Sequence, residues 1–173
     1  MNILTLTDDK QLQIYMHPKR QEILYQLSIQ GPMTAKMLST SLAMTPSSAK
    51  HHLGKLQELG VVAVDHQEVI NGITATYYRK VRVTVSFGAL EEQSRRLVTD
   101  FLSKQVHDGL EEHARSFSDE QGHFQADQLS GVVHLSAEEA DRLYWMIRTF
   151  IDEREDKREG TEPFVYSLVA YHA

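Results

Sequence analysis

The 173-residue sequence contains no cysteine and only one tryptophan. Without cysteine the chain cannot form disulfides, bind a metal through thiolates or use a cysteine nucleophile. No apolar run approaches the ~20 residues that a membrane-spanning helix needs, and the first residues do not have the pattern of a signal peptide. We therefore expect a cytoplasmic protein without a membrane segment.

Catalytic motifs are also missing. The sequence has no HExxH pair, no nucleophile elbow and no glycine-rich phosphate loop. Its nine histidines are dispersed along the chain rather than grouped. We therefore predict that the protein is not an enzyme, that it needs no cofactor and that it has no metal site.

Charge is distributed unevenly along the chain. The formal net charge is −6, yet residues 10–84 hold nine Lys or Arg against four Asp or Glu, a balance of +5. Residues 85–173 hold nine basic and eighteen acidic residues, a balance of −9. This asymmetry favours a basic module joined to an acidic one, and the alternative is ordinary variation of the surface.

Three short amphipathic helices are predicted before residue 61. The first begins at Pro18 and ends before Gly31-Pro32, and the second is capped by Thr34. The third has Thr45 as its N-cap, Pro46 at its first position and Gly60 at its end. Its apolar stripe predicts a buried face, formed by Ala49, Leu53, Leu56 and Leu59.

A β-hairpin is predicted directly after these helices. Residues 61–70 and 73–87 have strand patterns, and they flank Asn71-Gly72, a strong signal for a two-residue turn. Val81, Val83 and Val85 alternate with polar residues, as in a half-buried strand. Three helices followed by a hairpin describe a winged helix-turn-helix, within a protein of the α+β class.

In such a fold the third helix enters the DNA major groove, and its polar face becomes the candidate site. Short hydroxyls at the N-terminus can approach the backbone or the bases, and lysines can contact phosphates. The candidate DNA-binding residues on the helix are Thr45, Ser47, Ser48, Lys50, His51 and Lys55. On the hairpin the candidates are Asn71 and Gly72 at the tip and Arg79 and Lys80 on the second strand. Arg82, further along this strand, can also reach the DNA backbone. We expect His52 to be a packed residue, and Lys19 and Arg20 to be structural or phosphate-facing.

The first half of the chain resembles the ArsR-type winged-helix regulators, over roughly residues 5–85. The residues that carry the resemblance are His17-Pro18-Lys19-Arg20 with Ile23, Leu24 and Leu27; Leu42 to Ser47 with His51-His52-Leu53, Leu56 and Gly60-Val61-Val62; and Asn71-Gly72 followed by Tyr77-Tyr78-Arg79. The last group is similar to the wing of a subgroup with an extended C-terminal region. The resemblance implies a dimeric transcriptional regulator, usually a repressor.

Metal sensing, which many members of that family perform, is not carried over to this chain. The sequence has no cysteine, and its acidic helix does not reproduce the Asp-x-His arrangement of the zinc sensors. His107 and Glu111 have a helical spacing at which a pair can share a zinc ion. We interpret them instead as part of a solvated acidic face.

The second half is predicted to mediate dimerisation. A helix from Ala89 to about Phe117 carries a full apolar stripe, which is costly to leave in water. A second copy of the same helix is the simplest cover, because two-fold dimers are the commonest oligomers. Such a homodimer would place two recognition helices about 34 Å apart, as a palindromic operator in double-stranded DNA requires.

A strand–helix–strand is predicted at the C-terminus, with strands near 132–135 and 163–171 and a helix opened by the capping box Ser136–Glu139. Trp145, Met146, Tyr166 and Tyr171 are interpreted as core residues, and the alternative is a pocket for a small-molecule effector. The predicted domains are residues 1–87, which bind DNA, and 88–173, which dimerise. The alternative function is a winged-helix protein-interaction module that does not bind DNA.

Overall fold

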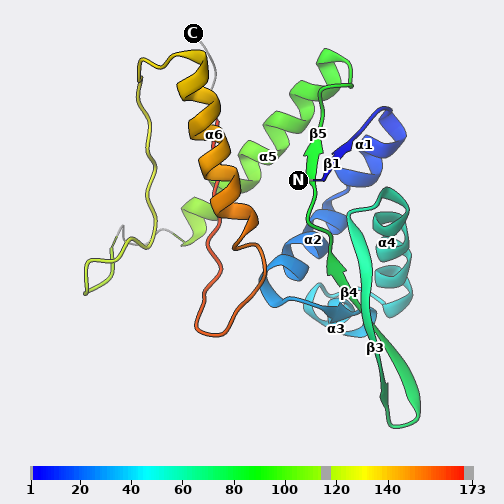
Figure 1. Ribbon diagram of the computed structural model, residues 1–173. Helices are drawn as coiled ribbons and strands as arrows, with labels where there is room; N and C mark the ends of the chain where they lie inside the picture. Colours follow the sequence, from blue (N-terminus) through cyan, green and yellow to red (C-terminus); the bar gives the residue numbers. More distant parts are fainter. Residues whose placement is uncertain (1, 114–117, 170–173) are drawn as a thin grey trace. The chain divides into compact units, whose positions relative to one another are not determined.

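The computed structural model describes residues 2–113 and 118–169 (Figure 1). The chain divides into two compact units. The first comprises the residues up to Arg95 together with Phe150–Pro163, and the second contains the chain from Arg96 to Thr149 and from Phe164 onward. The domain boundary predicted at residue 87 stays a prediction.

Four helices lie in the first unit before its β-hairpin. They are α1 (Asp9–Tyr15), α2 (Pro18–Gln30), α3 (Ala35–Ser41) and α4 (Pro46–Leu59). The three predicted helices are confirmed together with their caps, because Thr34 and Thr45 accept N-terminal amides and Gly31 and Gly60 are the C-caps. Helix α1 was not predicted. The core of this unit contains the fully buried side chains Leu6, Ile23, Leu38, Leu53 and Leu56.

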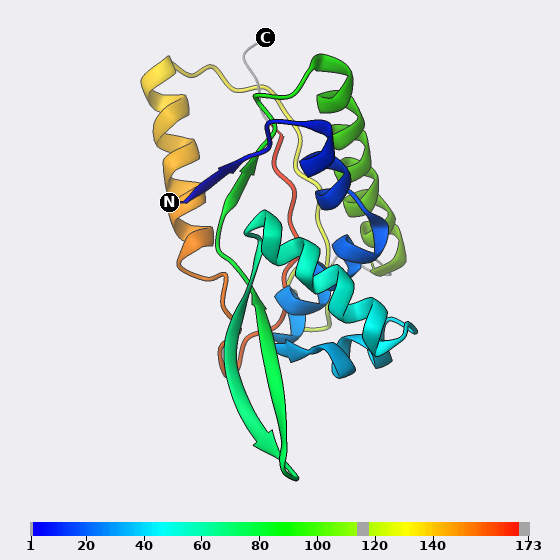
Figure 2. The ribbon, with the colours of Figure 1, turned by 90° about the vertical axis from the view of Figure 1, so that its right-hand side faces the viewer.

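A three-stranded antiparallel sheet completes the winged helix-turn-helix. Its order is β2 (Met33–Thr34), β4 (Ile73–Lys80) and β3 (Val62–Ile70). Figure 2 shows α4 beside the sheet and the β3–β4 hairpin extending beyond the helices. The predicted hairpin is confirmed, since Ile70 pairs with Ile73 across Asn71-Gly72. A bulge between Val64 and His66 leaves Asp65 outside the regular register.

The second predicted strand of the hairpin is interrupted. It was expected to run over residues 73–87, but β4 ends at Lys80 and a separate strand, β5 (Thr84–Ser86), follows. Strand β5 pairs in parallel with β1 (Ile3–Thr5). Val81, Val83 and Val85 are half-buried, but Thr84 and Ser86 are also half-buried, and of the three valines Val85 alone lies in a strand. Alternation also does not reveal which strand is the partner.

A long helix follows the wing, as predicted. Helix α5 (Glu92–His113) starts three residues later than expected, because Leu90 first closes a turn by donating its N–H to the Phe87 carbonyl at 3.1 Å. Val98 is buried, whereas Leu97 is largely exposed. The predicted positions Ala114 and Phe117 lie outside the described residues. No described helix is long and apolar enough to cross a membrane.

Helix α6 (Ala137–Asp152) is confirmed with its capping box, but the two strands predicted around it are wrong. Ser136 donates its N–H to Glu139 at 2.8 Å, and Glu139 donates its N–H to the Ser136 hydroxyl at 3.2 Å. Residues 131–136 and 163–169 form no strand. Their apolar pattern suits a strand, but neither segment joins either of the sheets in the described chain.

The aromatic and methionine residues of this region are not in a core. The side chain of Trp145 is 68% exposed, and Met146 and Tyr166 are also more than half exposed. The interpretation of these three as core residues is therefore wrong for the single chain. Tyr171 lies outside the described residues.

Candidate nucleic-acid interface

Helix α4 is oriented by its two ends and by its buried side. The Thr45 hydroxyl accepts the Ser48 N–H at 3.1 Å, and Gly60 ends the helix with a left-handed φ of 84°. Ala49, Leu53 and Leu56 have no exposed surface. Because residues three and four apart share one face of a helix, this burial determines which polar residues point outward.

The outward face of α4 presents several of the predicted contact residues. Thr45, Ser47, Lys50 and His51 are exposed, and Ser48 is half-buried. Lys50 has no carboxylate partner among residues 2–113 and 118–169. The structure thus brings these residues to one accessible surface, while their role in DNA binding stays a prediction.

Lys55 differs from Lys50 because it is already engaged. Its Nζ lies 2.7 Å from Oε2 of Glu58, one turn further along α4. The hydrogen bond from Lys55 is the main reason that the pKa of Glu58 lies below its ordinary value. The C-terminal end of the helix therefore carries a neutralised pair rather than a free cation.

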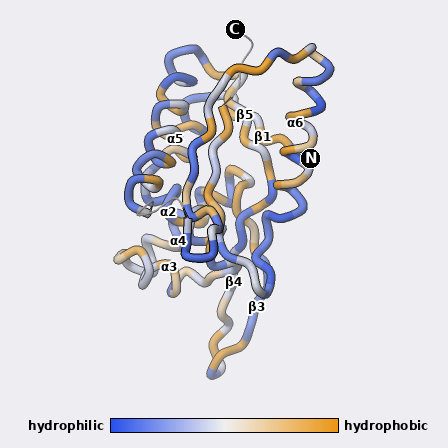
Figure 3. Tube along the Cα trace, turned by 90° about the vertical axis from the view of Figure 1, so that its left-hand side faces the viewer, coloured by the Kyte–Doolittle hydropathy of each residue, from blue (hydrophilic) through white to orange (hydrophobic). Residues whose placement is uncertain are grey.

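The tip of the hairpin is uncharged, with a polar turn flanked by apolar side chains. Asn71 and Gly72 form the turn with φ values of 50° and 78°, and both are exposed. Val69, Ile70 and Ile73 flank them and are exposed, Ile73 to 73%. Figure 3 shows these hydrophobic stretches on both strands next to the hydrophilic turn. The tip can therefore reach a groove or a backbone, but it brings no cation there.

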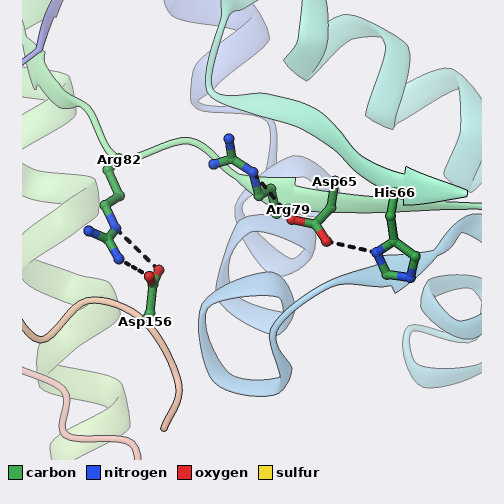
Figure 4. A network of polar contacts seen from close by, with 5 residues as sticks. All are labelled: Asp65, His66, Arg79, Arg82 and Asp156. Atoms are coloured by element: carbon green, nitrogen blue, oxygen red, sulfur yellow. Dashed lines mark hydrogen bonds and ion pairs between the residues drawn. The ribbon is translucent and has the colours of Figure 1, made fainter.

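The cations at the base of the wing are all paired with carboxylates. Arg79 Nε lies 3.3 Å from Asp65 on the neighbouring strand, and Lys80 Nζ lies 3.0 Å from Glu155. Arg82 Nε donates to Asp156 at 3.1 Å, and a second nitrogen of the same guanidinium contacts the other carboxylate oxygen. Figure 4 shows the Arg79 and Arg82 pairs as separate contacts. The predicted phosphate contacts of the wing are thus occupied within the chain.

His66 is a wing residue that the sequence analysis did not single out. Its Nδ1 lies 2.7 Å from Asp65, and its ring stacks on that of Tyr77 with centroids 4.3 Å apart. Figure 4 shows Asp65 between His66 and Arg79. Counting outward from the two-residue turn pairs His66 with Tyr77, so the signal was present. The bulge that places Asp65 between His66 and Arg79 was not visible in the sequence.

The residues expected to be structural are packed at the N-terminus of α2. His17 caps this helix by accepting the Lys19 N–H on Nδ1 at 3.2 Å, and its ring lies against His52. Arg20 is only 9% exposed. Its guanidinium donates to the carbonyls of Gln13 and Ile14 at 3.4 and 3.1 Å. Arg20 therefore holds the end of α1 rather than facing a phosphate.

Metal binding would require several ligating side chains close together. In the part of the chain that the structure describes, no three His, Cys, Asp or Glu side chains gather in a way that would hold a metal ion. His107 Nε2 lies 3.2 Å from Glu111 on an exposed face of α5. This pair matches the solvated face that the sequence predicted.

Comparison with known families decides what kind of helix-turn-helix this is. Residues 17–64, which contain α2, α3, α4 and the start of β3, match the family model described as bacterial regulatory protein, arsR family. This segment is an ArsR-family helix-turn-helix. The family consists of transcriptional regulators and is not an enzyme family, and DNA binding and homodimers are typical of it.

Several solved structures are similar to part of this chain. A homodimeric winged helix-turn-helix DNA-binding domain from Mycobacterium bovis, a possible ArsR-family regulator, is 22% identical, covering 59% of this chain and 79% of its own, with a TM-score of 0.38. A transcriptional regulator homologue from Pyrococcus horikoshii is 23% identical, covering 58% and 94%, with a TM-score of 0.39. The adhesin competence repressor of Streptococcus pyogenes is 16% identical over 83% of each chain, with a TM-score of 0.36. The comparison with curated proteins gives no match.

Proposed function

We propose that the protein is a homodimeric, sequence-specific DNA-binding repressor that inserts α4 into the major groove and lays the β3–β4 hairpin beside it. The observation that carries this proposal is the exposed outward face of α4, in the segment that matches the ArsR family. Its serine and threonine hydroxyls lie at the helix N-terminus, where close approach to DNA is easiest. In this proposal Lys50 supplies a cation for a phosphate, and His51 donates to a base edge.

Dimerisation through α5 follows from its exposed apolar surface. Leu97 is 61% exposed, and Phe101, Leu102 and Val106 are only half-buried in one copy. A second copy of α5 would cover these side chains, which gains free energy in proportion to the apolar area removed from water. Two α4 helices one DNA turn apart would then read a palindromic operator. Such a dimer represses by occupying the DNA that polymerase needs.

The proposal is tested by measuring affinity for a duplex from the gene's own upstream region by fluorescence anisotropy. We expect affinity to fall by orders of magnitude between about 50 and 200 mM salt. Lys50→Ala should weaken binding to every duplex and reduce the salt slope by about one, whereas His51→Ala should relax preference at one base pair.

Lys104→Ala is the matched control, because it removes a lysine of α5 that pairs with Asp108 at 2.9 Å. It should leave affinity unchanged. If the wild-type protein shows no salt-dependent binding to any duplex, the proposal fails, and a protein-interaction module becomes the better interpretation.

A further inference from the structure

The acidic turn that follows α6 is joined to the base of the wing. Two ion pairs form this contact, Lys80 with Glu155 and Arg82 with Asp156, and each joins residues about 75 positions apart in the sequence. Both partners lie in the same compact unit, which includes Phe150–Pro163. The Lys80 and Glu155 side chains are about one-third exposed, so this pair is partly withdrawn from solvent.

The acidic turn, residues 153–156, is held in shape by Arg154. The Arg154 guanidinium lies over the Phe150 ring at 3.9 Å and donates to the Phe150 carbonyl at 3.1 Å and to Glu153 at 2.9 Å. The backbone N–H of Arg154 also closes a turn on Ile151 at 2.8 Å. Glu155 and Asp156 are therefore presented from an ordered helix end.

Carboxylates and DNA phosphates use the same donors. An arginine guanidinium binds either group through two parallel N–H bonds, and a lysine ammonium binds either as a point charge. Arg82 contacts both oxygens of Asp156, as it would contact two oxygens of a phosphate. The two cations cannot hold the acidic turn and a DNA backbone at the same time.

We propose that the acidic turn is an internal substitute for DNA phosphate that occupies Lys80 and Arg82 and competes with the duplex for them. This inference rests on the proposed DNA-binding function. The Arg82–Asp156 pair is exposed and the Lys80–Glu155 pair is only partly buried. Ion pairs this close to the surface contribute little to stability, so a duplex that brings many phosphates displaces the turn. The acidic turn thereby lowers the affinity for DNA that contacts the wing alone. DNA that also engages α4 is still bound.

The test compares the full chain with Glu155→Gln/Asp156→Asn, which keeps side-chain size and removes two charges. We expect this variant to bind a duplex about 2- to 10-fold more tightly than wild type. Glu159→Gln/Glu162→Gln is the matched control, since it changes net charge equally within the same segment. Neither of these carboxylates pairs with Lys80 or Arg82. The control should show a clearly smaller gain.

Arg82→Ala provides a second comparison. In the wild-type background it should weaken DNA binding only slightly, because Asp156 already engages Arg82. In the Glu155→Gln/Asp156→Asn background the same substitution should cost several-fold more affinity. If the double variant does not fold, the single variants Glu155→Gln and Asp156→Asn serve the same comparison.

The outcomes separate the two proposals. If neither the wild type nor any variant binds a duplex, the DNA-binding function itself fails. If the wild type binds and the variant at positions 155 and 156 gains no more affinity than the control, DNA binding stands and the competition is refuted.

Discussion

The imidazole rings of His17 and His52 lie with their centroids 4.9 Å apart, where the N-terminus of α2 meets α4. His17 uses Nδ1 as a helix cap, and Nδ1 of His52 is buried without a hydrogen-bond partner in the described chain. Burial is the main cause that lowers the pKa of His52 below 6.5, and electrostatic interactions with neighbouring basic residues lower it further. These groups are His17, Arg20, His51 and Lys19. The packing of α2 on α4 therefore favours a neutral His52.

The first prediction is that acidification destabilises the protein through His52. Between the lowered pKa and about 6.5 the unfolded chain binds more protons than the folded one, so the free energy of unfolding falls as pH falls. Urea denaturation between about pH 5 and 7 should show this slope in the wild type and a flatter one in His52→Gln. The pKa of Glu58 lies below 4.5, so its contribution is lost only at lower pH.

His134→Gln is the control for this measurement, because His134 is an exposed residue before α6. The free energy of unfolding of His134→Gln should depend on pH as steeply as that of the wild type. Equal slopes for the wild type and His52→Gln would show that His52 does not couple folding to pH.

The second prediction separates Arg20 from its neighbour Lys19. Arg20→Met should lower the free energy of unfolding by about 1.5–3 kcal/mol, because charged hydrogen bonds to the end of α1 are lost. Lys19→Met should change it by less than about 1 kcal/mol, since Lys19 forms a half-exposed pair with Glu22 at 2.7 Å. Chemical denaturation measures both, and equal effects would contradict the structural role of Arg20.

The third prediction concerns the glycine within α4 and the glycine that caps it, which should behave in opposite ways. Gly60 has a φ of 84°, which L-residues disfavour, so Gly60→Ala should cost about 1–2 kcal/mol. Gly54 lies within the helix, and a Cβ built there meets no atom within 4 Å. Gly54→Ala should therefore raise stability by up to about 1 kcal/mol. Thermal denaturation that gave both changes the same sign would contradict the cap geometry.

Local signals account for the agreement between sequence and structure in the first half. Thr45 with Pro46, Gly60, and the Asn71-Gly72 turn act within a few residues, so their effect is the same wherever the segment lies. The outward face of α4 follows from its apolar stripe alone. Helix α4, the β3–β4 hairpin and most of the candidate DNA-binding surface were therefore predictable from the sequence.

The prediction of the C-terminal strands failed because it depended on distant rather than neighbouring residues. Val132 and Val133 have the composition of a strand, but strand formation needs a partner for the backbone hydrogen bonds. The sequence does not identify that partner. The same limit applies to Val85, whose strand pairs with β1 rather than continuing the hairpin.

The sequence by itself determined the winged helix-turn-helix and the polar surface of α4, because caps, breakers and periodicity are properties of neighbouring residues. Only the tertiary structure decided that Lys80 and Arg82 meet Glu155 and Asp156. Charge composition shows that such groups exist, but not which of them meet. Pairs separated by about 75 residues depend on how the whole chain folds back, and nothing local encodes that distance.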